Sequence, residues 1–351
     1  MPDIRTESVR ISPRLLVLIA EIDEFKGAWA AVGRLEPERL RSLRRVATIE
    51  SIGSSTRIEG ARLTDAQVER LLSNLTVGSF ASRDEQEVAG YATVMELVFE
   101  SHAHMPITES VIRQLHRDLL RFSDKDARHR GSWKTMPNSV EAFDADGRSL
   151  GVVFETATPF DTPRRMAELV AWHDDATRSG ELHPLLVIAI FIVVFLEIHP
   201  FQDGNGRLSR ILTTLMLLRA GYDYVPYSSI ESIIERHKEQ YYLALRRTQR
   251  TIHRAEPDWE PWIDFLVGTL HAHMQHLRTK VEREEAAFAA LPELSIRLIE
   301  LAREHGRITV ADAVELTGAS RNTIKKHLQR LCERERLVQH GRGRGTWYAE
   351  R

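Results

Sequence analysis

The sequence predicts a mostly α-helical protein with one small β-hairpin and a C-terminal winged helix-turn-helix. Three observations lead to this fold class. Apolar residues recur at helical spacing over most of the 351 residues. Residues 131–162 are instead rich in glycine and proline, which predicts extended chain and turns. After Pro292 the pattern changes to short helices followed by a Gly-Arg-Gly-Arg-Gly turn.

Four helices are expected before the hairpin. The first covers residues 37–59 and ends at Gly60, since glycine most easily adopts the left-handed conformation that follows a helix. The second begins after Thr64, which is a favourable N-cap residue. The third and fourth cover Asp84–Glu100 and Thr108–Phe122. The N-terminal half of the chain is therefore expected to be helical.

The hairpin is expected between residues 131 and 158. Its strands would be Trp133–Met136 and Val152–Thr156, on either side of an Asp146-Gly147 turn.

The next helix contains the longest apolar run of the chain, Leu185 to Leu196. A helix over 184–198 that starts at Pro184 would be buried on all sides, and the run is too short to span a bilayer. An amphipathic helix is expected over 207–219, and further helices over 230–250 and 257–289.

The C-terminal part has the pattern of a winged helix-turn-helix. A helix around residues 296–301 and a second over 310–316 precede a recognition helix over 320–331, and strands at 337–338 and 346–348 form the wing. Residues 320–344 contain eight Lys or Arg residues against two Glu residues. This charge favours DNA binding by residues 291–351, while a protein-interaction or dimer module, and hence a homodimer, stays open as the alternative.

The overall composition fits a soluble globular protein. The formal net charge is −2, which argues against a nucleic-acid-binding surface over the whole molecule. Cys332 is the only cysteine, so no disulfide forms within the chain, and the N-terminus lacks the apolar stretch of a secretory signal. These features predict a cytoplasmic protein without a membrane segment. Cys332 itself is expected to be a small buried thiol.

Residues 199–210 (His-Pro-Phe-Gln-Asp-Gly-Asn-Gly-Arg-Leu-Ser-Arg) contain the candidate catalytic and phosphate-binding residues. They connect the buried helix to the next one, whose N-terminus favours an anion. Arg207 and Arg210 are three residues apart, so their guanidinium groups lie on one side of that helix and predict a polyphosphate site. Asp203 would bind Mg²⁺, and His199 would accept a proton. A zinc site at His199 and Asp203 is less favoured because no partner histidine falls at metal spacing.

This segment resembles the signature of the Fic family, HPF-x-(D/E)-G-N-G-R-x-x-R, at every fixed position. The resemblance extends over about residues 40–250 and includes the hairpin, called the flap, and Tyr241-Tyr242. It implies a Fic core that transfers AMP from ATP, with Mg²⁺, to a hydroxyl of a target protein docked on the flap at 131–158. Gly206 favours AMP transfer, because family members that act as kinases have lysine there.

The resemblance also implies a role for each residue of the segment. His199 would be the catalytic base, Phe201 would anchor the loop and Asp203 would bind the metal. The ATP-binding residues would be Gly204, Asn205, Gly206, Arg207, Leu208, Ser209 and Arg210, with Arg207 and Arg210 on the β- and γ-phosphates. His237, Tyr241 and Tyr242 are candidates for the nucleoside pocket, although two neighbouring tyrosines are also typical of a helix core.

Residues 55–60 (Ser-Thr-Arg-Ile-Glu-Gly) resemble the Fic inhibitory motif, (S/T)-x-x-x-E-(G/N). The inhibitory residues would be Ser55, Glu59 and Gly60. Glu59 would pair with Arg210 and so occupy the arginine that the γ-phosphate needs. In some relatives the same glutamate helps to remove AMP, so Glu59 is a candidate for both directions.

We therefore expect four regions: a helical region with the inhibitory motif at 1–100, the Fic core at 101–250, a helical connector at 251–290 and the winged helix at 291–351. The leading hypothesis is an autoinhibited protein adenylyltransferase. The alternatives are a DNA-binding regulator whose Fic core senses nucleotide, a Fic enzyme that removes AMP, and one that uses another phosphate-linked donor.

Overall fold

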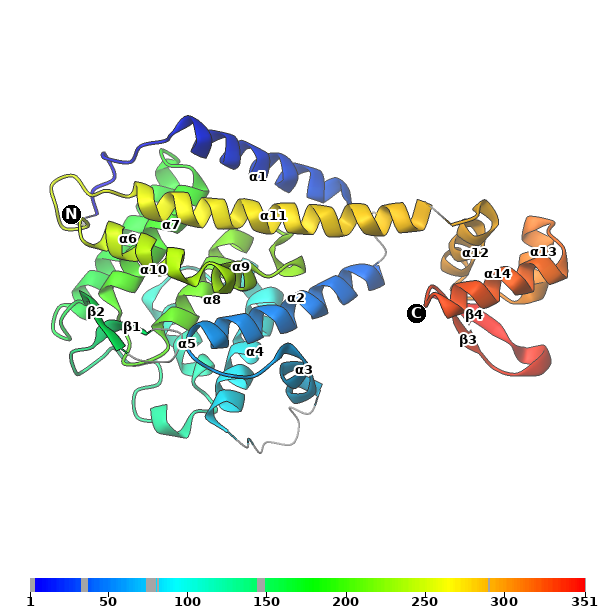
Figure 1. Ribbon diagram of the computed structural model, residues 1–351, viewed down its shortest axis with the longest axis horizontal. Helices are drawn as coiled ribbons and strands as arrows, with labels where there is room; N and C mark the ends of the chain where they lie inside the picture. The colour runs from blue at the N-terminus through cyan, green and yellow to red at the C-terminus, as the bar shows by residue number, and fades with distance from the viewer. Residues whose placement is uncertain are drawn as a thin grey trace. The chain divides into compact units, whose positions relative to one another are not determined.

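The computed structural model describes residues 4–32, 37–73, 80, 82–143, 149–289 and 291–350. The chain divides into two compact units, residues 1–277 and 278–351 (Figure 1). The first unit is helical apart from one two-stranded hairpin, as the sequence predicts. Over the described ranges, no helix combines the length and the apolar character needed to cross a membrane.

Two helices form the centre of the first unit: α7 (Pro184–Ile198) and α8 (Asn205–Arg219). Every residue of α7 from Leu185 to Ile198 is buried, which confirms the prediction of a helix with no exposed face. His183 caps α7 by accepting a hydrogen bond from the Leu185 amide, and Pro184 occupies its first turn. The turn between α7 and α8 is the segment in which the sequence places the chemistry.

Helix α1 (Pro13–Val32), which the sequence analysis did not predict, lies alongside this core. Its Phe25 ring meets the Tyr224 ring edge to face, with centroids 5.0 Å apart. Its Asp23 accepts hydrogen bonds from the Tyr222 hydroxyl at 2.7 Å and pairs with His183 at 2.9 Å. These contacts fix α1 to the start of α7 and to the chain after α8.

Helices α2 (Pro37–Ile58), α3 (Asp65–Ser73) and α4 (Arg83–Ser101) follow, close to the predicted bounds. Helix α2 ends as expected, because Gly60 has a positive φ of 104° and the Ala61 amide bonds back to the Thr56 carbonyl at 3.1 Å. Glu59 therefore lies between Ile58, the last residue of α2, and the turn at Gly60.

Helix α5 (Glu109–Leu119) precedes the hairpin, whose strands are β1 (Ser139–Phe143) and β2 (Ser149–Glu155), paired antiparallel. The predicted first strand, Trp133–Met136, is wrong. Those residues form irregular chain, since the Lys134 amide bonds to the Pro200 carbonyl at 2.8 Å rather than to a strand partner. The expected Asp146-Gly147 turn lies outside the described residues.

The remaining helices of this unit are α6 (Thr162–Ser179), α9 (Ile230–Arg236), α10 (Lys238–Gln249) and the first part of the long α11 (Glu260–Ala289), which continues past residue 277. The helix expected over 230–250 is broken at His237, where Nδ1 donates to the Ile233 carbonyl at 2.9 Å. Trp262 of α11 donates from Nε1 to the Ala189 carbonyl of α7 at 2.7 Å. Through this bond α11 is attached to the central helix.

The second unit contains α12 (Glu293–Glu304), α13 (Val310–Thr317), α14 (Arg321–Glu333) and a hairpin of β3 (Val338–His340) and β4 (Trp347–Ala349). Ser320 caps α14 through the Thr323 amide, and Gly318 with φ 70° ends α13. The unit has its own core, which includes Leu298, Ile324 and Leu328. The winged-helix assignment and the four domain boundaries stay predictions.

Candidate active site

His199 lies where α7 ends and the loop begins. Its backbone is left-handed, with φ 52°, and its amide bonds to the Phe195 carbonyl at 2.9 Å. The ring Nδ1 lies 3.3 Å from the Leu196 carbonyl, which can only accept, so Nδ1 holds the proton and Nε2 is left as a free acceptor. Burial lowers the pKa of His199 to about 4. The residue is therefore neutral at pH 7, as a general base must be.

The loop is closed by Asn205. Its Oδ1 accepts from the Phe201 amide at 2.9 Å, and its Nδ2 donates to the Phe201 carbonyl at 2.8 Å. Helix α8 thus begins at Asn205, two residues earlier than expected, after Gly204 with φ 82°. Asn205 is 1% exposed, so its side chain shapes the loop from inside the structure and does not face solvent.

His116 supports the loop from α5, and the sequence analysis missed it. Its ring stacks on the Phe201 ring, with centroids 3.7 Å apart and planes at 9°. Nδ1 accepts from the Gly131 amide at 2.9 Å, and Nε2 donates to the Asp203 carbonyl at 3.0 Å. Burial lowers its pKa to about 4, in keeping with the neutral ring that these two bonds require. A histidine inside an amphipathic helix offers no sequence signal for this role.

Asp203 and Arg207 belong to a closed ring of alternating charges. Arg207 pairs with Asp203 at 3.2 Å and with Glu87 of α4 at 3.0 Å. Arg83 completes the ring, contacting Glu87 at 2.8 Å and Asp203 at 3.0 Å. Burial works to raise the pKa of Asp203, but the Arg207 charge and the Gly204 amide outweigh it, so the pKa is lowered and the carboxylate stays ionised. The sequence did not indicate Arg83 or Glu87.

Arg210 is held by the inhibitory segment. Its Nη2 donates to Glu59 at 2.8 Å and to the Ser55 carbonyl at 3.0 Å, and its Nε donates to the Ser55 hydroxyl at 2.8 Å. Arg210 is 4% exposed, while the Glu59 side chain is 32% exposed. Burial would raise the pKa of Glu59, yet the Arg210 charge outweighs it and the pKa is lowered. The Glu59–Arg210 pair is therefore charged on both sides near neutral pH.

Glu59 also lies against the first turn of α8. A Cβ atom built on Gly206 would approach the Glu59 carboxyl carbon to 3.0 Å and would overlap its Oε1. The first amides of a helix have no partner within it and attract an anion. The carboxylate thus occupies the end of α8 that the resemblance assigns to phosphate.

The other predicted ATP-binding residues are placed differently. Leu208 is fully buried, and its amide already bonds to the Gly204 carbonyl at 2.9 Å. The Ser209 hydroxyl donates to the Gly206 carbonyl at 2.8 Å. Tyr241 is 4% exposed against Trp262, with centroids 5.7 Å apart, and lies beside Arg210. His237 is exposed at the break between α9 and α10. Leu208 and Tyr241 are therefore buried residues that pack within the structure and do not face a ligand.

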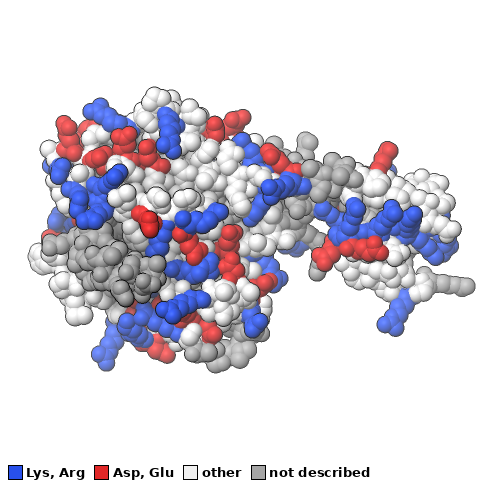
Figure 2. Space-filling view, in the orientation of Figure 1, with Lys and Arg blue, Asp and Glu red and all other residues white. Residues whose placement is uncertain are grey.

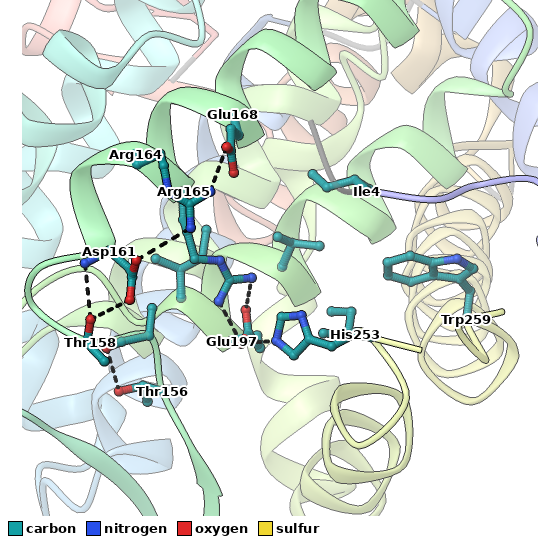
Figure 3. Close-up of a pocket in the computed structure, with 14 residues that line it drawn as sticks. Ile4, Thr156, Thr158, Asp161, Arg164, Arg165, Glu168, Glu197, His253 and Trp259 are labelled. Atoms are coloured by element: carbon teal, nitrogen blue, oxygen red, sulfur yellow. Dashed lines mark hydrogen bonds and ion pairs between the residues drawn. The ribbon is translucent and has the colours of Figure 1, made fainter. Parts of the chain in front are cut away.

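A pocket of about 490 Å³ lies beside the last turn of α7, separate from the loop residues (Figure 3). In its wall the Glu197 carboxylate, 4% exposed, pairs with Arg165 at 2.7 Å and with His253 at 3.0 Å. Burial would raise the pKa of Glu197, but His253 and Arg165 outweigh it and the pKa is lowered. These pairs join α6 and the chain after α10 to the helix that ends at His199.

Within the described part of the chain, no three His, Cys, Asp or Glu side chains gather in a way that could hold a metal ion. The chemistry of Asp203 nevertheless fits Mg²⁺, which commonly takes one or two carboxylates and completes its shell with phosphate and water. One third of the Asp203 side chain is exposed, at 33%, beside the α8 N-terminus. Asp203 would be the protein ligand.

Comparisons with known proteins agree with this geometry. Residues 106–217 match the Fic/DOC family, and residues 283–351 match a family of bacterial proteins of unknown function, DUF977. The protein adenylyltransferase Fic of Drosophila grimshawi is 28% identical over 250 residues, which are 71% of this chain and 46% of that protein. The chain thus spans less than half the length of this curated relative.

Solved structures extend the likeness. A Fic family protein from Desulfovibrio desulfuricans is 25% identical with a TM-score of 0.64, and the match covers 99% of this chain and 98% of that one. A Fic-domain signaling protein from Bacteroides thetaiotaomicron is 26% identical with a TM-score of 0.58, over 73% of this chain and 94% of that one. Fic-1 from C. elegans, 20% identical with a TM-score of 0.59 over 76% of this chain and 73% of that one, shares the fold. With the complete loop at 199–210, these matches show that residues 106–217 are similar to the Fic/DOC family and that the chain resembles solved Fic proteins in fold.

Proposed function

We propose that the protein transfers AMP from ATP to a Ser, Thr or Tyr hydroxyl of a target protein. The observation that carries the proposal is the state of His199: its Nδ1 is bonded to the Leu196 carbonyl and its Nε2 is free and unprotonated. Relatives named protein adenylyltransferase Fic support the choice of reaction. Gly206, the position at which the resemblance favours AMP transfer over kinase activity, has no side chain, and a Cβ atom built there would meet Glu59.

The reaction would be a single displacement at phosphorus. Nε2 of His199 takes the proton of the target hydroxyl while its oxygen bonds to the α-phosphorus. The bond from the α-phosphorus to the oxygen that bridges to the β-phosphate breaks, and pyrophosphate leaves. Arg207 and Arg210 would hold the β- and γ-phosphates, with the amides of Asn205 and Gly206 beside them. Mg²⁺ at Asp203 would neutralise phosphate charge. The enzyme contributes position and charge rather than a covalent intermediate.

Glu59 would restrain this reaction. The carboxylate takes a donor of Arg210 and lies against the α8 N-terminus, the two features that would bind the terminal phosphates. ATP bound beside Glu59 would have its α-phosphorus turned away from the hydroxyl. The arrangement also leaves Glu59 near the loop for the reverse reaction, removal of AMP. A donor other than ATP also fits the site, since Arg207, Arg210 and the α8 N-terminus would bind phosphate groups and do not contact a base.

The target would dock by adding a strand to the hairpin of β1 and β2. The single cysteine supports a reducing, cytoplasmic setting.

Intact-mass analysis tests the proposal. Wild type, Glu59→Gly and Glu59→Gly/His199→Ala are incubated with ATP and Mg²⁺. We expect one AMP-sized addition on Glu59→Gly, much less on wild type and none on the double variant. The absence of any AMP adduct, on this protein and on lysate proteins supplied as targets, would exclude AMP transfer. Equal modification of wild type and Glu59→Gly would exclude the restraint by Glu59 but not AMP transfer itself.

A second candidate function concerns the second unit: binding of duplex DNA. Over the residues described there, the cations of the exposed α14 face form no salt bridge, and Figure 2 shows Lys and Arg side chains in a row on the visible face of this unit. Asn322 and Gln329, side chains suited to base edges, are exposed on the same helix. The unpaired cations are Arg321, Lys325, Lys326 and Arg330.

Fluorescence anisotropy of the full chain with a duplex, at several salt concentrations, tests DNA binding. We expect affinity that falls steeply with salt, and a shallower slope for Lys325→Ala/Lys326→Ala. Arg297→Ala is the control, because Arg297 is already paired with Glu300 on α12. No binding at low salt would exclude this candidate.

A further inference from the structure

Two residues that precede the hairpin bond to four consecutive carbonyls around the proposed base. Lys134 donates from Nζ to the Ile198 carbonyl at 3.0 Å and from its amide to the Pro200 carbonyl at 2.8 Å. Asn138 donates from Nδ2 to the Phe201 carbonyl at 2.8 Å and reaches the His199 carbonyl at 3.5 Å. The backbone on both sides of the His199 ring is therefore held by these two side chains and one amide.

The location explains why a lysine is buried here. The last carbonyls of a helix have no partner within it and carry partial negative charge, so a cation at the end of α7 is stabilised. Lys134 is 2% exposed, and burial lowers its pKa to about 8 although the Glu197 charge works in the opposite direction. A buried ammonium group is costly unless its donors are all used. At Lys134 all three find acceptors.

The other two acceptors of Lys134 are at the base of the hairpin. Nζ donates to Asn138 Oδ1 at 2.8 Å and to the Thr156 hydroxyl at 2.9 Å. Asn138 and Thr156 are the residues next to Ser139 and Glu155, the pair that begins the ladder of β1 and β2. One ammonium group thus connects both ends of the hairpin to the last carbonyl of α7.

We propose that Lys134 and Asn138 are positioning residues that hold His199 at a fixed place relative to the target-docking hairpin. This inference rests on the proposed function, because it assigns the hairpin and His199 to one reaction. A target hydroxyl presented by the hairpin reaches Nε2 only if both move together. Displacement of a reacting group by about 1 Å can lower a rate about 100-fold.

The charges around His199 support this role. Besides burial, which is the main cause of its lowered pKa, the His199 ring is influenced by three charges: the Lys134 ammonium lowers the pKa, and the Glu59 and Asp203 carboxylates raise it. Lys134 therefore helps to keep the base neutral as well as in place.

Kinetics in the Glu59→Gly background test the proposal. We expect Lys134→Met to lower kcat for protein modification about 100-fold, while the Kd for ATP stays unchanged because residues 204–210 are intact. Asn138→Ala, which removes the amide donors, should act in the same direction. Lys26→Met is the matched control: Lys26 also donates to a carbonyl at a helix end, Ala220 of α8 at 2.7 Å, far along the chain from the loop. It should lower stability without lowering kcat.

A folded Lys134→Met protein with unchanged kcat overturns the proposal, as does a loss of ATP affinity that accounts for the whole loss of rate. If Lys134→Met does not fold, the kcat of Asn138→Ala and its Kd for ATP test the proposal instead. If Glu59→Gly itself transfers no AMP, the proposed function fails, and the NMR titration of the His199 ring then tests separately whether Lys134 acts on this ring. A higher His199 pKa in Lys134→Met supports it, and an unchanged pKa contradicts it.

Discussion

The carboxylate of Glu59 and a side chain at residue 206 compete for one space. A Cβ atom at Gly206 would lie 3.0 Å from the Glu59 carboxyl carbon. Alanine within a helix is normally about 0.5–1 kcal/mol more stable than glycine. We therefore expect Gly206→Ala to destabilise wild type but to stabilise Glu59→Gly.

Urea denaturation of the four proteins in this double-mutant cycle measures the coupling, for which we expect about 1–3 kcal/mol. Additive effects of the two substitutions would show that Glu59 does not lie against Gly206 in solution.

The pH dependence of AMP transfer should report the lowered pKa of His199. The neutral ring is the base, so kcat/KM, which reflects the free enzyme, falls as the pH drops through about 4 and is flat near neutrality. Removal of Glu59 would lower this pKa further, since the Glu59 charge raises it. The measurement is a kcat/KM profile of Glu59→Gly, and an acidic limb near the ordinary histidine value of about 6.5 would contradict it.

His116→Phe should destabilise the fold although it preserves a ring beside Phe201. The substitution leaves the Gly131 amide and the Asp203 carbonyl without partners, and each loss costs about 1–3 kcal/mol. His173→Phe is the control. His173 also meets a phenylalanine, Phe191 at 5.4 Å, and in the described structure it has no hydrogen bond. Thermal unfolding of both variants tests this, and equal changes in Tm would argue against the two bonds.

Arg57→Ala should raise basal AMP transfer by releasing the end of α2. The Arg57 guanidinium bonds to both Glu235 oxygens of α9, at 2.7 and 3.1 Å, and to Asp65 at 2.9 Å. We expect an increase of several-fold, smaller than that of Glu59→Gly, because Arg210 still pairs with Glu59.

Arg45→Ala removes another α2 ion pair, that of Arg45 with Glu69 at the surface, and should have no effect. The increase should also vanish in the Glu59→Gly background. If Arg57→Ala still raised AMP transfer in the Glu59→Gly background, the increase would not come from release of the Glu59 restraint.

Much of the first unit could be predicted from local patterns. The continuous apolar run predicts α7, and Gly60 predicts the end of α2 because glycine alone adopts φ 104° without strain. Helices α1 and α6 were missed. In α1 the exposed Leu16 and Val17 obscure the apolar stripe, at 61% and 54% exposed. The strand expected at Trp133–Met136 failed because the Lys134 amide bonds to the Pro200 carbonyl, a contact between segments far apart in sequence.

The candidate site could likewise be predicted only in part from local sequence patterns. The residues of one continuous segment, 199–210, could be assigned from their order, and Glu59 from its motif. His116, Arg83, Glu87 and Lys134 could not, because their side chains acquire a role only when α4, α5 and the hairpin base meet the loop. Nothing in the residue pattern around Lys134 indicates that this lysine is only 2% exposed.

The ring of ion pairs around Asp203 includes residues that lie outside the segment that matches the Fic/DOC family. Arg83 and Glu87 stand before the matched segment 106–217, as does Ser55, yet they bind the two loop arginines and the aspartate. A fragment cut at the limits of the family match would lack Glu87, one of the two carboxylates paired with Arg207, and Glu59, which pairs with Arg210. The loop at 199–210 therefore keeps all of its ion pairs only when helices α2 and α4 are attached, beyond the limits of the sequence match.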